Sequence, residues 1–193
     1  AVGFSYDEYE QKVQDALGDI GYQVKSIHHF ADPVAAVEQF EAIAVGGGNT
    51  FLLTKMLYEL GWMDAIREAV EVGLPYAGSS AGSNVAGKSM RTTNDMPIVY
   101  PPSFDALGLI PFNINPHYLD PDPSSKHMGE TRETRINEFH TQNIEAVLGL
   151  REGNWLSVLG EKATVEGRHT TRLFRRDMQA VELQAGVDIS FLL

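Results

Sequence analysis

The chain has 193 residues, enough for one well-filled domain, and a net charge of −11, which argues against a nucleic-acid partner because phosphate binding depends on lysine and arginine. It contains no cysteine, which excludes disulfides, thiolate metal ligands and a cysteine nucleophile. No apolar run approaches the roughly 20 residues that cross a bilayer, so we expect a soluble, cytoplasmic protein without a membrane partner.

The first part of the chain alternates helical and strand-like segments. Ser5 and Glu8 can form a capping box at the start of the first helix. This alternation, with short glycine loops, is typical of a mostly parallel sheet whose two faces are covered by helices. The expected order is a helix at residues 5–17, a strand at 24–30, a short helix at 32–40, a strand at 42–45, helices at 51–60 and 63–72, and a strand that ends before Gly78.

The second part is less regular. It has a long passage without clear periodicity after Arg91, and its last fifty residues alternate apolar and polar side chains between glycine turns, which favours antiparallel strands. We therefore expect a three-layer α/β fold with a mostly parallel sheet, helices on both faces and an antiparallel C-terminal flank. The expected elements here are a strand at 112–117, a surface loop at 120–130, a helix at 131–142 and the antiparallel flank at 146–193.

The segment from Pro75 to Asn84 carries the strongest chemical signal. Gly78-x-Ser80-x-Gly82 has the form of a nucleophile elbow, in which a tight turn between a strand and a helix lifts a serine hydroxyl clear of the sheet. The glycines leave room for a strained serine and for close approach of neighbouring backbone. Ser80 is therefore the candidate nucleophile. The alternative is an ordinary turn, rich in glycine and serine, before a helix.

A serine hydroxyl needs a base to accept its proton, usually a histidine that a carboxylate orients. His117 is the best placed, because it ends a predicted strand and so lies at the carboxyl edge of the sheet, where Ser80 is also expected. A histidine that only bonds to backbone is the alternative. The other histidines fall on an early strand, in a loop, on a helix and near a turn: His28, His29, His127, His140 and His169.

These motifs, taken with others in the chain, resemble peptidase E, the aspartyl dipeptidase family of serine peptidases. The resemblance runs in family order over nearly the whole chain, and it implies a fold similar to that of the class I glutamine amidotransferases. The matching segments are VGGGNTF at 45–51, SAG at 80–82, RTTNDMPI at 91–98, FDAL at 104–107, NPH at 115–117, GETRE at 129–133 and EGNW at 152–155.

The chain departs from the family pattern in two places. Ser79 stands where bacterial members typically carry tryptophan, which would reshape the rim of the site and leave Ser80 in place. The family also has an opening strand and a crossover before the helix with which this sequence begins. We therefore expect residues 1–193 to form a single peptidase domain without that strand, and we expect the resulting gap to destabilise the sheet.

Carried over by position, the resemblance implies Ser80 as nucleophile and His117 as general base. Asp95 and Glu152 both match acids proposed for the third position. We favour Asp95, because a short carboxylate on a loop soon after the nucleophile is held by local backbone bonds, whereas Glu152 has one more rotatable bond to fix. If these acids are not catalytic, Asp95 would be a residue of an Asx turn, and Glu152 would be a solvent-exposed acid in a turn.

The oxyanion hole would use the N–H of Ala81 and one from Gly47 or Gly48, whose lack of a side chain allows close approach. The alternative for this glycine run is a phosphate cradle. No Gly-Lys-Ser/Thr ending follows it, and Asn49 stands in that place, which disfavours nucleotide binding.

An acidic protein that binds an acidic substrate needs a local cation. Arg132 lies in the GETRE segment that the family uses near its acid-recognising pocket, and its guanidinium can hold a carboxylate with two bonds. Arg135 is one turn further on, and Arg91 is near Asp95. We expect Arg132 to select an N-terminal aspartate. In the alternative, all three arginines form surface salt bridges.

The sequence therefore predicts a serine dipeptidase that hydrolyses small peptides with an N-terminal aspartate through an acyl-enzyme, without metal or other cofactor. A related amidase or esterase on the same scaffold and an inactive binding module are the alternatives. The sequence leaves the oligomeric state open.

Overall fold

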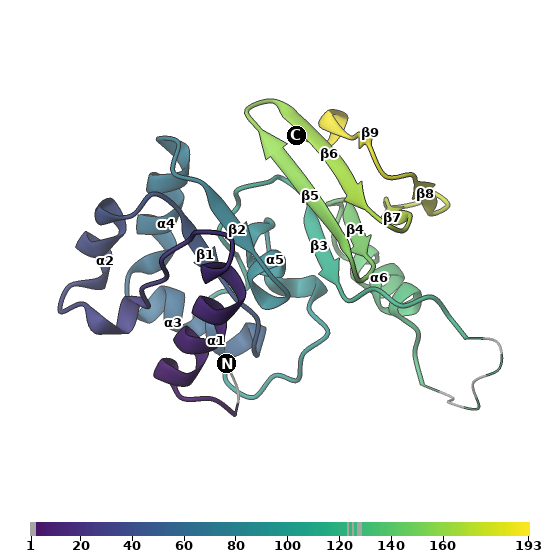
Figure 1. Cartoon of the computed structure of the whole chain (residues 1–193). Coiled ribbons are helices and arrows are strands. Elements are labelled where there is room, and N and C mark those ends of the chain that lie inside the picture. Colours follow the sequence, from purple (N-terminus) through teal and green to yellow (C-terminus); the bar gives the residue numbers. More distant parts are fainter. Residues whose placement is uncertain (1–2, 123, 125, 127–128) are drawn as a thin grey trace.

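The computed structural model describes residues 3–122, 124, 126 and 129–193. Figure 1 shows two groups of elements, with the N-terminal helices around β1 and β2 and the C-terminal strands on the other side. The helices are α1 (Tyr6–Gly18), α2 (Pro33–Ala36), α3 (Thr50–Glu59), α4 (Trp62–Glu71), α5 (Ala81–Ala86) and α6 (Arg132–His140). The strands are β1 (Ile43–Val45), β2 (Tyr76–Gly78), β3 (Asn113–Pro116), β4 (Val147–Leu150), β5 (Asn154–Leu159), β6 (Lys162–Gly167), β7 (Thr171–Phe174), β8 (Val181–Leu183) and β9 (Val187–Asp188). Short 3₁₀ segments are η1 (Ile27–His29), η2 (Val37–Gln39), η3 (Met90–Thr92) and η4 (Ser190–Leu192).

The N-terminal group is built on one parallel pair of strands. β1 and β2 pair with Val45 opposite Gly78, so the glycine run and the Ser80 turn leave the same edge of the sheet. Helices α3, α4 and α5 pack here because each turns apolar side chains to a common core. That core contains Leu57, Met63, Ile66, Val85, Ala106 and Leu107.

The C-terminal group brings strands from three parts of the sequence together. β3 pairs in parallel with β4, which continues antiparallel through β7 to β8, while β5, β6 and β9 form a second antiparallel sheet. The two sheets share an apolar core, which explains the alternation of buried and exposed side chains along β6. The core contains Ile110, Phe112, Ile114, Leu148, Leu150, Ala163, Val165, Leu173 and Ile189.

Most expected elements are present, and the mixed α/β class is confirmed. The capping box at Ser5 forms, with the Glu8 N–H donating to the Ser5 hydroxyl and the Ser5 N–H donating to the Glu8 carboxylate. The helix expected at 32–40 is shorter, because α2 gives way to the 3₁₀ turn η2. Residues 123, 125, 127 and 128 of the loop expected at 120–130 lie outside the described residues.

Two expectations are wrong for the described residues. The sheet is not mostly parallel: only β1–β2 and β3–β4 are parallel, because tight turns after β4 join neighbouring strands antiparallel. The strand expected at 24–30 is an irregular segment with the 3₁₀ turn η1. Its backbone N–H groups at Val24 and Ser26 donate to the side chains of Gln14 and Glu10 on α1, which take the place of a neighbouring strand.

No helix in the described part of the chain combines the length and the apolar character that a membrane crossing requires.

Candidate active site

Ser80 stands on a strained turn between β2 and α5. Its φ of 55° and ψ of −111° place it in a region that non-glycine residues rarely occupy. The elbow expected from the sequence therefore forms. Backbone strain of this kind persists only where the surroundings hold it, and it is common at active sites.

The two glycines of the elbow allow backbone segments to approach closely. A Cβ atom on Gly82 would lie 1.9 Å from the carbonyl oxygen of Val45, and one on Gly78 would lie 2.6 Å from the carbonyl oxygen of Gly82. The buried hydroxyl of Tyr76 donates to that same Gly82 carbonyl at 2.8 Å. The turn is therefore clamped between β1 and β2, and the orientation of Ser80 follows from it.

His117 reaches the serine from the C-terminal group of strands. It follows the last residue of β3 and has a φ of 54°, so both Ser80 and His117 belong to the small set of non-glycine residues with positive φ among those described. The His117 Nε2 atom lies 2.8 Å from the Ser80 Oγ atom. The predicted pair of hydroxyl and imidazole is therefore within hydrogen-bond distance.

Glu152 contacts the other nitrogen of the same imidazole. Its Oε1 atom bonds to the His117 Nδ1 atom. The position follows from strand pairing: Pro116 of β3 lies opposite Leu150 of β4, so the residues just past both carboxyl ends meet. Ser80, His117 and Glu152 thus form a continuous chain of contacts, with the side chains of His117 and Glu152 both substantially exposed.

Asp95, which the sequence analysis favoured, does not bond to the imidazole. Its Oδ2 atom accepts hydrogen bonds from the backbone N–H and the hydroxyl of Thr50, both at 2.7 Å, at the first turn of α3. The preference for Asp95 over Glu152 is therefore wrong as regards contact with His117. The free N–H groups at the start of a helix attract a carboxylate, so the start of α3 competes with His117 for Asp95.

The glycine run lies against the nucleophile. A Cβ atom on Gly47 would lie 3.1 Å from the Cβ atom of Ser80, so the backbone of this loop borders the serine directly. The Gly47 N–H donates to the Tyr9 hydroxyl at 3.1 Å. Among the described residues, the N–H groups of Gly48 and Ala81 have no acceptor. The N–H groups of Ala81 and of Gly48, one of the two alternatives for the second expected donor, are thus unengaged, while that of Gly47 is bonded to Tyr9.

Sequence reasoning missed Tyr9 and Asn94. Tyr9 is one of two aromatic residues on α1, and only the folded position of that helix brings its hydroxyl to Gly47. Asn94 donates to the carbonyl oxygen of Pro116 at 2.8 Å and accepts from Asn115 at 2.9 Å, which ties the loop after η3 to the strand that carries His117. The sequence feature that could have pointed to Asn94 was its position next to Asp95 in the RTTNDMPI segment.

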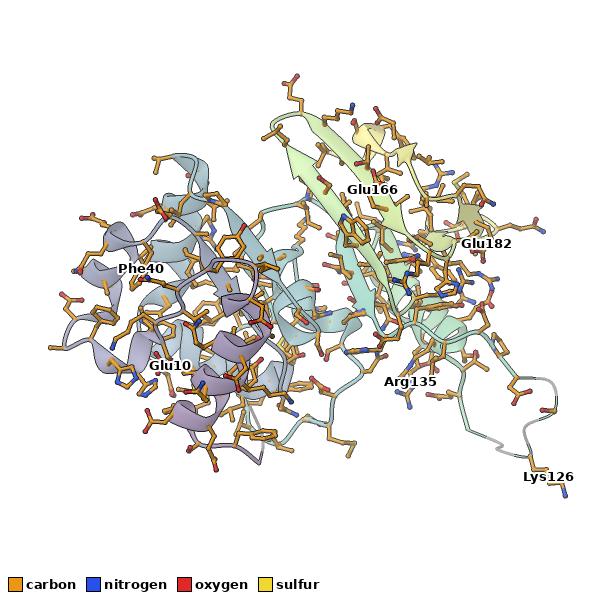
Figure 2. The ribbon with its side chains drawn as sticks, viewed as in Figure 1. Glu10, Phe40, Lys126, Arg135, Glu166 and Glu182 are labelled. Atoms are coloured by element: carbon orange, nitrogen blue, oxygen red, sulfur yellow. The ribbon has the colours of Figure 1, made fainter. Side chains whose placement is uncertain are left out.

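The three arginines differ in their partners. Arg91 pairs with Asp105 at 3.8 Å and Arg135 with Glu130 at 3.6 Å. Arg132, at the start of α6, is half-buried and has no carboxylate within salt-bridge distance among the residues described. Figure 2 shows Arg135 on the α6 side of the molecule, below the C-terminal strands.

The environment of Arg132 suits an anion. Burial and the neighbouring Arg135 lower the pKa of its guanidinium, and the negative charge of Asp95 opposes that shift. A buried guanidinium that lacks a paired carboxylate is costly to desolvate, and an anionic ligand would remove that cost. Asp95, whose charge acts on Arg132, follows Asn94, which donates to the Pro116 carbonyl next to His117.

A cleft of about 780 Å³ opens beside the nucleophile. Ser80, His117 and Glu152 line it from one side, and Tyr76 and Trp155 contribute aromatic surface. Clefts of this size accommodate small organic ligands. The side chains of Ser80, His117 and Glu152 are therefore accessible to a ligand of the size of a short peptide.

Comparison with known proteins shows the family of the chain. A family model described as Peptidase family S51 matches residues 1–166. The chain is similar to a peptidase E from Streptomyces coelicolor, with 54% identity over 188 residues that cover 97% of this chain and 77% of that protein. It is 52% identical over 189 residues to a protein from Drosophila melanogaster named as a probable alpha-aspartyl dipeptidase, covering 97% and 79% of the two chains.

Solved structures support the fold. A peptidase from an acI-B1 Actinobacterium superposes with a TM-score of 0.71 at 20% identity, over 98% of this chain and 79% of that one. A second structure, from Listeria monocytogenes, gives a TM-score of 0.67 at 21% identity, over 87% and 81% of the two chains. The family match and the high identity of the relatives lead to one conclusion: the chain belongs to peptidase family S51.

Proposed function

We propose that this protein is a serine dipeptidase that hydrolyses the peptide bond after an N-terminal aspartate. The observation that carries the proposal is the chain of contacts from the Ser80 hydroxyl through the His117 imidazole to the Glu152 carboxylate. This arrangement has the geometry of a nucleophile, a base and an orienting acid. Membership of the peptidase family and the names of the relatives support the substrate class.

In the first half of the reaction, the Ser80 oxygen attacks the carbonyl carbon of the aspartyl residue while His117 Nε2 accepts the hydroxyl proton. Glu152 accepts a hydrogen bond from the Nδ1–H group of His117. This bond keeps the ring in the tautomer whose Nε2 can accept the serine proton, and it stabilises the imidazolium. The tetrahedral intermediate then collapses, the C–N bond breaks, and His117 returns its proton to the leaving amine. The aspartyl group remains as an ester on Ser80.

In the second half, a water molecule replaces the amine. His117 accepts a proton from the water, the hydroxide attacks the ester carbonyl, and the Ser80–acyl bond breaks as the proton passes to the serine oxygen. In this proposal the N–H groups of Ala81 and Gly48 stabilise the oxyanion in both halves; the absence of an acceptor for either group among the described residues supports this role. If the Gly47 N–H also stabilises the oxyanion, its hydrogen bond to the Tyr9 hydroxyl must break first.

Selection of aspartate is assigned in this proposal to Arg132. Its half-buried guanidinium without a salt-bridge partner among the described residues would bind the β-carboxylate of the substrate in a bidentate manner. Arg91 and Arg135 are less suitable, because each already has a carboxylate partner.

The experiment compares kcat/KM for Asp-Leu, Asn-Leu and Ala-Leu. We expect the native protein to prefer Asp-Leu, and Ser80→Ala to lose activity by at least about 10³-fold on every substrate. Arg132→Ala should reduce kcat/KM for Asp-Leu by roughly 10²-fold and change Ala-Leu little, because only the aspartyl dipeptide loses a charge-assisted pair.

Arg135→Ala is the matched control, because it removes the same side chain one turn further along α6. It should leave the ratio of Asp-Leu to Ala-Leu close to that of the native protein. Equal losses on both dipeptides in Arg132→Ala would refute the selector role, and substantial hydrolysis by Ser80→Ala would refute the serine mechanism.

A further inference from the structure

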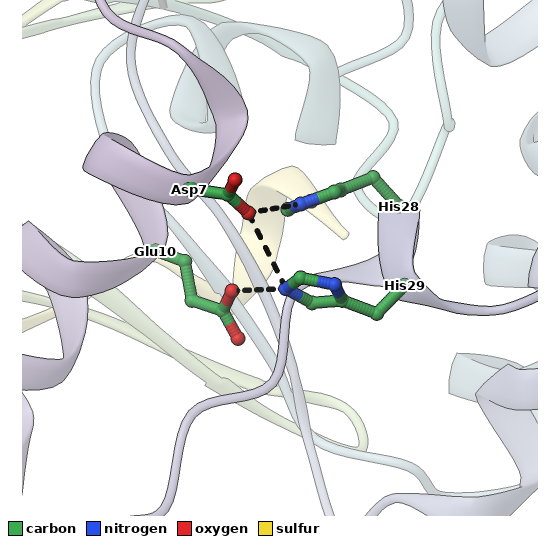
Figure 3. A group of neighbouring side chains, drawn as sticks. All are labelled: Asp7, Glu10, His28 and His29. Carbon is green, nitrogen blue, oxygen red and sulfur yellow. Dashed lines mark hydrogen bonds and ion pairs between the residues drawn. The ribbon is translucent and has the colours of Figure 1, made fainter.

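A second group of histidines and carboxylates lies outside the catalytic residues, between α1 and η1. Asp7 and Glu10 stand three residues apart on one face of α1, and His28 and His29 project from η1 toward them (Figure 3). We propose that these four side chains form a binding site for a first-row divalent cation, with Zn²⁺ as the best fit, that fastens α1 to the segment around η1.

The ligand atoms converge on one point. One nitrogen or oxygen from each of the four side chains lies within 4.8 Å of all the others. The His28 Nε2 atom is 2.8 Å from Asp7 Oδ1, and the His29 Nε2 atom is 3.6 Å from the same oxygen and 2.5 Å from Glu10 Oε2. Ligands around a tetrahedral Zn²⁺ are about 3.3 Å apart, so small side-chain shifts suffice to enclose the ion.

Ser26 forms hydrogen bonds with two of the proposed ligands, His28 and Glu10. Its hydroxyl lies 2.7 Å from His28 Nδ1, and its backbone N–H donates to Glu10 Oε1 at 3.0 Å. When His28 Nδ1–H donates to this hydroxyl, Nε2 presents its lone pair to the centre of the group. Metal-binding histidines usually have their second nitrogen fixed in this manner, and such partners raise metal affinity.

The charges match a divalent ion. The carboxyl groups of aspartate and glutamate are ordinarily ionised near neutrality, and Asp7 and Glu10 each place an oxygen in the group of ligand atoms. Two carboxylates and two neutral imidazoles sum to −2. Imidazole nitrogens favour Zn²⁺ and similar ions over Mg²⁺ or Ca²⁺, which prefer oxygen ligands only.

The site has an approach from solvent and a protected side. The Asp7 side chain is 78% exposed, whereas that of Glu10 is 17% exposed, and the ring of Tyr6 covers His28 at 5.3 Å between centroids. An ion can therefore enter past Asp7 and come to rest against Glu10.

A cation here would strengthen the attachment of α1 to the rest of the fold. None of the residues in this helix is buried, so the apolar packing that fixes most helices is weak. The helix is held by polar contacts, including those from Gln14 to Tyr22 and Val24. Binding of a metal to the native state alone stabilises it in proportion to occupancy.

The test uses the untagged chain, because a polyhistidine tag would itself bind zinc. ZnCl₂ is titrated into the metal-free protein by isothermal calorimetry, with MgCl₂ as a second titrant, and thermal unfolding is recorded with and without zinc. We expect one equivalent of Zn²⁺ to bind, no Mg²⁺ to bind at the same concentration, and Tm to rise by about 5 °C at a hundredfold excess over Kd.

Variants locate the bound ion. Asp7→Asn and His28→Ala should each weaken zinc binding by at least about tenfold, and Ser26→Ala, which removes only the supporting hydroxyl, by roughly tenfold. His169→Ala, an exposed histidine on the other side of the molecule, is the control and should bind like the native chain. If His28→Ala does not fold, the visible spectrum of Co²⁺ bound to the native chain decides, because tetrahedral nitrogen and oxygen ligation has a characteristic strong band.

Three outcomes would overturn the proposal. The first is no heat of binding and no rise in Tm with zinc, in which case the four side chains act as ion pairs alone. The second is native-like zinc affinity in both Asp7→Asn and His28→Ala. The third is an octahedral Co²⁺ spectrum, which would indicate loose binding elsewhere on an acidic surface.

Discussion

The protein contains two groups that combine imidazole with carboxylate, and their geometry differs. In the catalytic group, the side chains form a line: hydroxyl, imidazole, carboxylate, with each ring nitrogen of His117 facing a different neighbour. In the group between α1 and η1, both His28 and His29 turn Nε2 toward the same pair of carboxylates. A line of contacts suits proton transfer through a ring, whereas convergent lone pairs suit an ion at their centre.

The backbone under the two groups differs as well. Ser80 and His117 both have positive φ, and the elbow is clamped by glycine contacts with Val45. The second group stands on an ordinary helix and a 3₁₀ turn. Strain that a fold maintains marks a place where side-chain direction matters for chemistry. Residue types alone therefore do not separate a line of contacts suited to proton transfer from a convergent group suited to an ion.

The largest expected effect tests the linear arrangement. Glu152→Gln should lower kcat for Asp-Leu by about 10² to 10⁴-fold, because an amide can favour the wrong imidazole tautomer and cannot stabilise the imidazolium. Steady-state kinetics measures it. Glu161→Gln, in the exposed turn between β5 and β6, is the matched control and should retain native kcat.

Asp95→Asn separates the two candidate acids. It should chiefly weaken the start of α3, with a fall of about 1 kcal/mol in the free energy of unfolding measured in urea, because Thr50 loses a charged acceptor. A loss of kcat in Asp95→Asn that exceeded the loss in Glu152→Gln would contradict the role given to Glu152.

The second prediction concerns the strained backbone turn that carries Ser80. Gly82→Ala should lower the free energy of unfolding by about 3 kcal/mol or more, because its Cβ atom would overlap the Val45 carbonyl. Gly160→Ala, at a glycine with positive φ that faces open space, should cost only about 1 kcal/mol. Chemical denaturation measures both, and similar losses in the two variants would argue against the clamped elbow.

A third and smaller effect concerns Tyr9, which lies between Asp7 and Glu10 in sequence and accepts the Gly47 N–H. Tyr9→Phe should raise kcat by about two- to tenfold, because the oxyanion no longer displaces a hydroxyl from that donor. Tyr22→Phe, which alters an exposed tyrosine on the following segment, is the control. A fall in kcat for Tyr9→Phe alone would show that the hydroxyl positions the loop instead.

The smallest effect tests the ion pairs beside Glu152. Arg151 binds Asp120 and Glu182, and its hydrogen bonds hold the pKa of both carboxyls below their usual values. A carboxyl with a lowered folded-state pKa stabilises the protein above its unfolded pKa, and this contribution is lost as the pH falls through the folded pKa. Figure 2 shows Glu182 beside the C-terminal strands, where it is partly exposed.

Glu182→Gln should therefore be less stable than the native chain by up to about 1 kcal/mol at pH 7, and this difference should shrink as the pH falls below about 4. Urea denaturation across pH 3–7 measures it, with the exposed Glu138→Gln as control. A difference that does not change with pH would mean that Glu182 acts through packing alone.

Much of the catalytic group followed from local sequence. The GxSxG spacing predicted the strained turn at Ser80, because only small residues fit where backbone segments meet so closely. The position of His117 at the end of an apolar strand predicted that it would reach the edge where Ser80 stands. The capping box at Ser5 likewise depends on residues three apart. Each of these inferences rests on neighbours in the chain.

Only the tertiary structure shows that Glu152, and not Asp95, contacts His117, since this contact depends on the pairing of β3 with β4 and on the competing start of α3. The same holds for Tyr9 at Gly47, for the absence of a strand at 24–30 and for the lack of a salt-bridge partner at Arg132 among the described residues. Periodicity describes one segment at a time, whereas a hydrogen-bond partner is set by competition among groups that are distant in sequence.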